Sequence, residues 1–328
     1  MGDLAMKKFF GAVSLIGILA TTLAAQNPDS PKSPGGATTA QAAGDTTRIR
    51  VRVELVNVLF SVTDRKNRLV LNLSKDDLRV LEDNKPQSIR FFSRESDLPL
   101  RIAILIDTSN SIRERLRFEQ EAAIDFLTTT LRPHKDQAFV VAFDVEPQLL
   151  QEYTDDMEKL SKAIRGLQAG GGTGLFDAMY FAAKEKMLFF PPPEPYLRRV
   201  MIVVSDGQDN FSEHARDEAL GMAQRGEVTI FSISTNRPNL EVGDKQGKGD
   251  KVLKYLAEET GGRAFFPFSA SDLAADFQEI ARELRSQYSL AYVSANTVHD
   301  GAYRAITIQS RDKNFRVRAK SGYFAPSQ

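Results

Sequence analysis

The chain has 328 residues, which is enough for one mid-sized domain and a smaller one. Lysine plus arginine (43) equals aspartate plus glutamate (43), so the composition predicts no bulk attraction to nucleic acid. There is no cysteine and there are only three histidines, which excludes disulfides and thiolate sites and disfavours a histidine-rich metal site. Any metal site is therefore expected to use oxygen ligands.

Residues 1–25 have the order of regions found in a secretory signal peptide. Lys7 and Lys8 precede an apolar run from Phe9 to about Ala20, and small residues follow. The alternative is an uncleaved anchor, but the run is short for a bilayer, which takes about 20 apolar residues. We therefore expect an exported protein, periplasmic or extracellular, with no later transmembrane segment. Residues 26–47 are rich in Pro, Ser, Gly, Ala and Thr and are expected to form a flexible linker.

Residues 48–98 form an N-terminal flank with the period-two alternation of β-strands. Arg48, Arg50 and Arg52 alternate with apolar residues, which is typical of a strand with one solvated face. Turn-forming residues separate the later pieces of the flank. Those pieces predict strands at Val58–Thr63, Arg79–Glu82 and Ser88–Phe92.

Residues 99–286 alternate between apolar strands and amphipathic helices. Apolar spacing near 3.6 residues predicts helices over Ile112–Thr130 and Leu273–Leu284, while the Lys- and Gly-rich segment 243–249 is typical of a mobile loop. The alternation predicts an α/β fold with a doubly wound, mostly parallel, Rossmann-like sheet. Its strands, which read as buried on both faces, are Ile102–Ile106, Phe139–Phe143, Val200–Val204 and Val228–Ile233, with a shorter one at Arg263–Phe266.

Residues 287–328 form a C-terminal flank that again reads as short strands, at Tyr288–Val293, Tyr303–Gln309 and Phe315–Lys320. Neither flank has enough strands to form a stable sheet by itself. We therefore expect 287–328 to pair with 48–98 in one small β-sandwich-like domain, with the central region inserted between them.

Polar residues follow the predicted strands of the central region where those strands end. Asp107-Thr108-Ser109-Asn110-Ser111 comes directly after one strand, and Asp206-Gly207 follows another. A third loop, 170–174, places Thr173 within a glycine run. In an open α/β sheet, ligands bind outside the carboxyl ends of the strands, where these loops meet. The residues expected to converge there are Asp107, Ser109, Ser111, Thr173 and Asp206.

This set of side chains suits a hard divalent cation. Two carboxylates balance a charge of 2+, and serine and threonine hydroxyls add neutral oxygen ligands. Mg²⁺ takes about six oxygens and retains several waters, which leaves a position for an outside ligand. Mg²⁺ is the expected ion, with Mn²⁺ and Ca²⁺ as alternatives. Each motif alone occurs often by chance, but their combination at the ends of apolar strands favours a metal site.

Asp107-x-Ser109-x-Ser111, then Thr173, then Asp206-Gly207 resembles the metal-ion-dependent adhesion site of von Willebrand factor type A (VWA) domains. This match covers residues 99–286. The flanks resemble those of VWFA-related exported proteins of acidobacteria, most closely at Asp76–Pro86 and Arg316–Pro326. The resemblance implies a non-catalytic adhesion or assembly module of the cell envelope, which binds a protein partner's Asp or Glu carboxylate through the metal.

Two other functions are compatible with the same fold. A magnesium-dependent phosphatase of the haloacid-dehalogenase type carries a second Asp two residues after the first, but Ser109 stands there, and no acid–base pair is evident. An envelope scaffold without a functional metal is the other alternative. Near the site, Asp209 and Asn210 are expected to shape their loop, and His214 to be a surface residue. Asp177 is expected to be a favourable charge near a helix N-terminus.

Overall fold

The computed structural model describes residues 55–95, 97–110, 113, 115–188, 197–236 and 245–327. The predicted signal peptide, the predicted linker and residues 48–54 lie outside the described residues, as do Ser111 and Ile112. Within the described part of the chain, no helix is both long and apolar enough to cross a bilayer.

Six strands form the central sheet, in the order β10-β9-β8-β5-β6-β7. All neighbours are parallel except β6 and β7, which are antiparallel. Numbered from β5 along the chain, the strands stand in the order 3-2-1-4-5-6, which is that of the Rossmann fold. The prediction of a doubly wound, mostly parallel sheet is confirmed. The strands are β5 (Leu100–Asp107), β6 (Gln137–Phe143), β7 (Pro147–Thr154), β8 (Arg198–Ser205), β9 (Val228–Ser234) and β10 (Ala264–Phe265).

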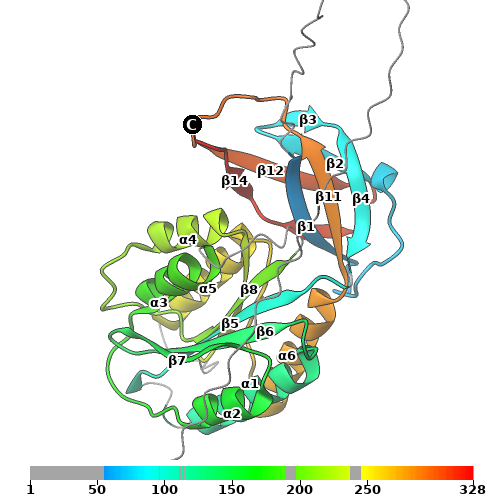
Figure 1. Cartoon of the computed structure of the whole chain (residues 1–328). Coiled ribbons are helices and arrows are strands. Elements are labelled where there is room, and N and C mark those ends of the chain that lie inside the picture. The colour runs from blue at the N-terminus through cyan, green and yellow to red at the C-terminus, as the bar shows by residue number, and fades with distance from the viewer. Residues whose placement is uncertain are drawn as a thin grey trace, which may run out of the picture. The chain divides into compact units, whose positions relative to one another are not determined.

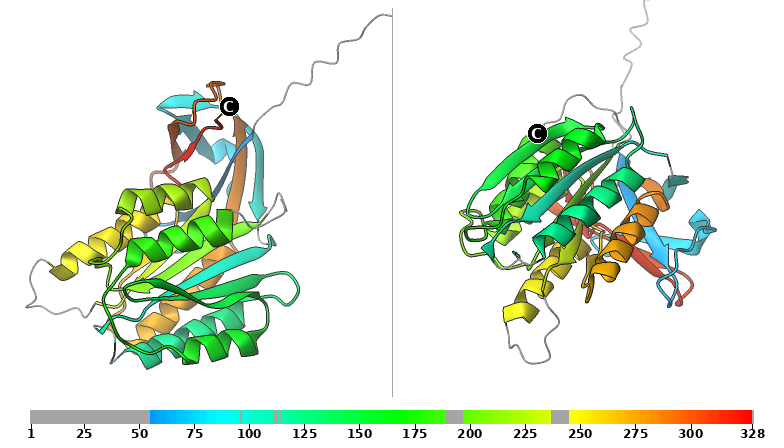
Figure 2. Two further views of the ribbon diagram at one scale, coloured as in Figure 1. Left: turned by 60° about the vertical axis from the view of Figure 1, so that its left-hand side comes forward. Right: turned by 90° about the horizontal axis from the view of Figure 1, so that it is seen from below.

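Helices cover both faces of this sheet (Figures 1 and 2). On one face lie α1 (Leu116–Thr130), α2 (Met157–Arg165) and α6 (Ala270–Leu284). On the other lie α3 (Leu175–Phe181), α4 (Arg216–Arg225) and α5 (Lys245–Glu259), and α3 continues as a π-helical segment, Ala182–Leu188.

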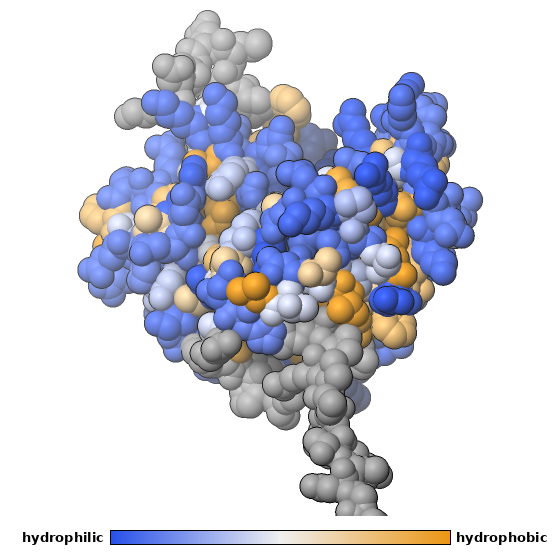
Figure 3. All heavy atoms as spheres, turned by 90° about the horizontal axis from the view of Figure 1, so that it is seen from above, coloured by the Kyte–Doolittle hydropathy of each residue, from blue (hydrophilic) through white to orange (hydrophobic). Residues whose placement is uncertain are grey.

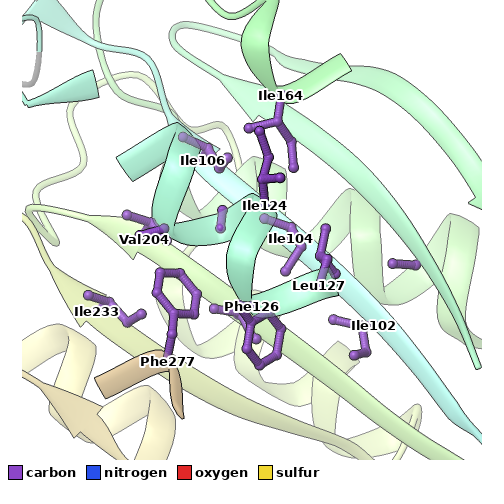
Figure 4. Close-up of a cluster of buried hydrophobic side chains, with 14 of the residues drawn as sticks. Ile102, Ile104, Ile106, Ile124, Phe126, Leu127, Ile164, Val204, Ile233 and Phe277 are labelled. Carbon is purple, nitrogen blue, oxygen red and sulfur yellow. The ribbon is translucent and has the colours of Figure 1, made fainter. Parts of the chain in front are cut away.

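Alternate side chains of β5 pack into the two apolar cores, one on each face of the central sheet. Ile102, Ile104 and Ile106 of β5 point toward α1 and α6, where Phe126 and Phe277 pack with ring centroids 5.2 Å apart (Figure 4). Ala103 and Leu105 enter the opposite core. This alternation explains why β5 reads as a continuous apolar run. Truncating one of these buried isoleucines to alanine is expected to cost about 2–5 kcal/mol.

The described part of the predicted mobile loop 243–249 differs from expectation. Residues 245–249, predicted as part of a mobile loop, belong to α5. A Cβ atom at Gly249 would lie 2.1 Å from the backbone oxygen of Asp206, so only glycine permits this helix turn to approach that loop. The prediction was wrong because Gly249 permits close packing inside a helix, and neither Gly247 nor Gly249 interrupts that helix.

The flanks form two antiparallel sheets of four strands, ordered β13-β1-β11-β4 and β14-β12-β2-β3. Each sheet contains strands from both flanks, so the predicted pairing of the flanks is confirmed. The two sheets share one apolar core, in which Phe60 stacks on Tyr288. The N-terminal strands are β1 (Leu55–Thr63), β2 (Leu78–Glu82), β3 (Lys85–Gln87) and β4 (Ile89–Glu95), with a 3₁₀ turn at Lys75–Asp77 before β2. The C-terminal strands are β11 (Gln287–Val293), β12 (Tyr303–Ser310), β13 (Arg316–Ala319) and β14 (Gly322–Phe324).

A buried carboxylate also joins the two flanks. Glu82 accepts hydrogen bonds from the hydroxyls of Tyr292 (2.9 Å), Tyr323 (3.0 Å) and Ser294 (2.5 Å), which all belong to the C-terminal flank. Because a buried acid is stable only with such partners, this network requires both flanks to be present. Figure 3, which views the molecule from above Figure 1, shows a mostly hydrophilic surface with scattered apolar residues.

Candidate metal centre

The two candidate carboxylates lie at the point where the order of the sheet reverses. Asp107 is the last residue of β5, and Asp206 follows the last residue of β8. These strands are neighbours in the middle of the sheet, and the chain leaves them in opposite directions along it. In doubly wound folds this topological switch point is where ligands bind. The topology therefore brings together two acids that are 99 positions apart in the sequence.

Asp107 is fully buried and is hydrogen-bonded through both oxygens. Its Oδ1 accepts from the backbone N–H of Ser109 (2.8 Å), and its Oδ2 accepts from the hydroxyl of Ser205 (2.7 Å). Burial raises the pKa of Asp107, the nearby charge of Asp206 acts in the same direction, and the hydrogen bonds oppose both, so that the pKa lies at about 6. A cation between the two acids would relieve both costs.

The Asp206 turn is positioned by close backbone packing. Gly207 has φ +75°, and a Cβ atom there would lie 2.3 Å from the backbone oxygen of Gly249. The amide of Asn236 donates to the backbone oxygen of Asp206 (2.9 Å) and to Asp250 of α5 (2.8 Å). The glycine after Asp206 is therefore required both by its backbone conformation and by lack of space.

Hydrogen bonds hold the Thr173 loop against both aspartate loops. The backbone N–H of Gly170 donates to the backbone oxygen of Thr108 (2.7 Å). On the other side, the backbone N–H of Thr173 donates to Oδ1 of Asn210 (3.0 Å), and the N–H of Asn210 donates back to the oxygen of Thr173 (3.0 Å). Gly172 lies so close to Phe211 that a Cβ atom would be 2.1 Å from its ring. The three loops are thus adjacent.

Asn210 and Asp209 shape the loop that contains them, as expected. They do so through hydrogen bonds to the Thr173 loop and to the start of α3. Asp209 accepts from the N–H of Phe176 (3.0 Å) at the start of α3. The role of Asp177 is larger than predicted, since it accepts from the backbone N–H groups of Glu213 and His214 (both 2.9 Å) and pairs with the His214 ring (2.7 Å). The sequence carries no signal for this pairing, because it depends on α3 meeting the 207–215 loop.

The described donors fit a hard divalent cation. Asp107, Ser109, Thr173 and Asp206 all have exposed fractions of 8% or less, so their oxygens are held in a protected position. Ser111 lies outside the described residues. Among the residues that the structure covers, no group of three or more His, Cys, Asp or Glu side chains could hold a metal, so hydroxyls would have to complete the set. Two carboxylates with hydroxyls is the donor chemistry of a Mg²⁺ site that keeps waters.

A groove of about 760 Å³ opens beside the centre, between β6, β7 and α2. Thr108, Asp144 and Gln168 line the end nearest the metal-site loops, and Lys159 and Lys162 line the side formed by α2. This groove provides a concave polar surface next to the candidate centre, where a segment of another molecule could lie.

Comparison with known families agrees with this topology. Residues 102–208 match the model of the von Willebrand factor type A domain. The chain contains a VWA domain. The matched residues begin in β5 and extend just past Asp206, so they include all three loops of the candidate centre.

Individual relatives are distant. Inter-alpha-trypsin inhibitor heavy chain H4 of Bos taurus is 25% identical over 231 residues, or 63% of this chain and 23% of that protein. Human von Willebrand factor A domain-containing protein 3B is 28% identical over 180 residues, or 52% of this chain and 12% of that protein. This chain therefore spans less than a quarter of either relative. The mussel byssus proximal thread matrix protein 1, in a structure with a zinc-occupied MIDAS motif, is 17% identical with a TM-score of 0.48, covering 62% of this chain and 49% of that one.

Proposed function

We propose that this protein is an exported, non-catalytic binding module of the cell envelope that holds another protein through a divalent cation. The observation that carries the proposal is the pair of buried carboxylates, Asp107 and Asp206, at the switch point of the sheet. Together with Ser109, Ser111 and Thr173 they would hold Mg²⁺, with Mn²⁺ and Ca²⁺ as alternatives. The match of residues 102–208 to the von Willebrand factor type A domain supports this proposal, because the resemblance to that domain was carried by these same residue types in this order.

The partner is proposed to present an Asp or Glu side chain. With only two protein carboxylates in the site, a bound Mg²⁺ would stay electrophilic and could accept a third carboxylate from outside. On the α2 side of the groove, Lys159 and Lys162 are exposed and would favour acidic residues in a partner segment. Asp144 and Glu146 also line the groove and would favour basic ones. The three loops would orient the metal, and the groove would supply the contact area.

Calorimetric titration of the full chain with Mg²⁺ and Mn²⁺ tests the metal site. Wild type is expected to bind, Asp107→Ala to lose binding, and Thr173→Ala to weaken it. Asp217→Ala on the exposed side of α4 is the control and is expected to bind as wild type does. If wild type binds neither ion, or if Asp107→Ala binds unchanged, the protein is a scaffold without a functional metal.

Capture of partners from envelope extract, with and without EDTA, tests the binding mechanism. Chelation is expected to abolish capture while circular dichroism shows the fold intact. Capture that survives EDTA contradicts a metal-bridged complex. Turnover of a phosphate ester that requires Mg²⁺ and is lost in Asp107→Asn would replace the binding function with the phosphatase alternative, for which no acid–base pair is evident in the sequence.

A further inference from the structure

A second cavity, of about 310 Å³, lies where the β-sandwich meets α6. It is formed by the end of β1, the turn that follows β1, the C-terminal part of α6, β13, and Arg263 just before β10. Two of its lining residues are acidic and five are cationic. The five cations are Lys66, Arg68, Arg263, Arg282 and Arg318.

Three of these cations already have acidic partners. Arg318 pairs with the buried Glu283 (2.6 Å), Arg263 pairs with Glu279 (2.6 Å), and Arg68 pairs with Asp64 just outside the lining (2.7 Å). Lys66 and Arg282 form no ion pair with any residue that the structure describes. The cavity therefore keeps a surplus of positive charge after its internal pairs are formed.

Two buried polar atoms at this cavity also lack partners within the described part of the chain. Thr63 is only 3% exposed, yet its Oγ1 has no hydrogen-bond partner, and the same is true of Nε of Arg318. Buried polar atoms are nearly always hydrogen-bonded, because leaving one without a partner costs the free energy of removing it from water. A bound oxyanion would accept from both.

The cavity wall is held in place before any ligand arrives. Glu283 accepts from the hydroxyl of Ser61 (2.5 Å) and from Arg318 (2.6 Å), which ties β1, β13 and α6 together. Asp64 accepts from the backbone N–H groups of Lys66 (2.7 Å) and Arg68 (3.0 Å), which orders the turn. Ligand binding at such a site loses little conformational entropy.

We propose that this cavity binds a doubly charged phosphate group. A phosphate dianion matches the charge surplus better than a single carboxylate does, and arginine forks suit its oxygens. Lys66 and Arg282 would neutralise it, and Thr63 Oγ1 and Arg318 Nε would donate to it. The group could belong to a soluble phosphate compound or to a lipid headgroup. The site is separate from the metal centre and does not depend on it.

Calorimetry of the full chain with inorganic phosphate and with pyrophosphate tests the site, in EDTA so that metal binding makes no contribution. Wild type is expected to bind both. Lys66→Ala combined with Arg282→Ala is expected to bind at least about tenfold more weakly. Lys248→Ala combined with Lys251→Ala, which removes two exposed cations of α5, is the matched control and is expected to leave affinity unchanged.

Thr63→Val separates binding from folding. Removing a buried hydroxyl that has no partner is expected to leave the melting temperature unchanged or higher while weakening phosphate binding. Sedimentation with phosphatidic acid vesicles identifies the source: binding that pyrophosphate displaces indicates a headgroup, and binding of the free anions alone indicates a soluble compound. The proposal is overturned if wild type binds neither anion, or if the Lys66/Arg282 and control variants lose affinity equally.

Discussion

Two buried aspartates lie at opposite ends of the central sheet, and their surroundings are opposite in character. Asp107 at the carboxyl end contacts hydroxyl and amide groups and lies near a second carboxylate. Asp136, at the amino end, has a side chain that is also fully buried, but it accepts from Arg132 (2.8 Å) and Arg285 (2.5 Å). It also accepts from the backbone N–H of Leu100 (2.8 Å).

The pKa values of these two groups differ accordingly. Burial raises the pKa of Asp107 to about 6. Burial acts in the same direction on Asp136, but the hydrogen bonds from Arg132, Leu100 and Arg285 outweigh it and hold its pKa at about 2. The amino end is thus internally neutralised and stabilises the fold, whereas the carboxyl end is short of positive charge. That contrast is what separates a structural buried acid from one available to a cation.

Asp136→Ala is expected to produce the largest loss of stability. It leaves Arg132 and Arg285 without their common partner and removes the acceptor of the Leu100 N–H, so the free energy of unfolding should fall by about 3–5 kcal/mol. Urea denaturation measures this. A loss below about 1 kcal/mol, similar to that of the exposed control Asp217→Ala, would show that the amino-end cluster contributes little.

Asp107→Asn is expected to behave in the opposite way. Without metal its free energy of unfolding should equal or exceed that of wild type, because a buried charge near Asp206 has been removed. With Mg²⁺ at 100 times its dissociation constant, wild type should gain about 2.7 kcal/mol and the variant nothing. If the variant is strongly destabilised without metal, Asp107 stabilises the fold as Asp136 does, and the proposed difference between the two aspartates is wrong.

Asp136 and Asp107 should contribute to the free energy of unfolding with opposite dependence on pH. The folded pKa of Asp136 lies below the ordinary value of 3.8, so its stabilisation is present above pH 4 and is lost as pH falls toward 2. The folded pKa of Asp107 lies above 3.8, so in EDTA its contribution falls as pH rises from 4 to 6. Relative to Asp107→Asn, wild type should therefore lose about 1–2 kcal/mol over that interval. Parallel curves for the two proteins would contradict the raised pKa.

The sequence alone determined the local features of this protein. The continuous apolar run Ile102–Ile106 predicted a strand buried on both faces, and spacing near 3.6 residues predicted the helices, because such patterns reflect burial within one element. The small number of predicted strands in each flank indicated that the two flanks pair, because a sheet of few strands is unstable alone. The position of Asp107 and Asp206 after apolar strands pointed to one edge of the sheet, and comparison with known families identified the VWA domain there.

Only the tertiary structure decided which distant groups meet. The hydrogen bond from Ser205 to Asp107 joins residues 98 positions apart, and Arg285 reaches Asp136 across 149 positions. The antiparallel edge strand β7, the Asp177–His214 pair and the helical conformation of 245–249 were likewise invisible in the chain order. Such contacts depend on the order of strands and on which helix ends share an edge, and these arise from packing of the whole chain and not from any local pattern.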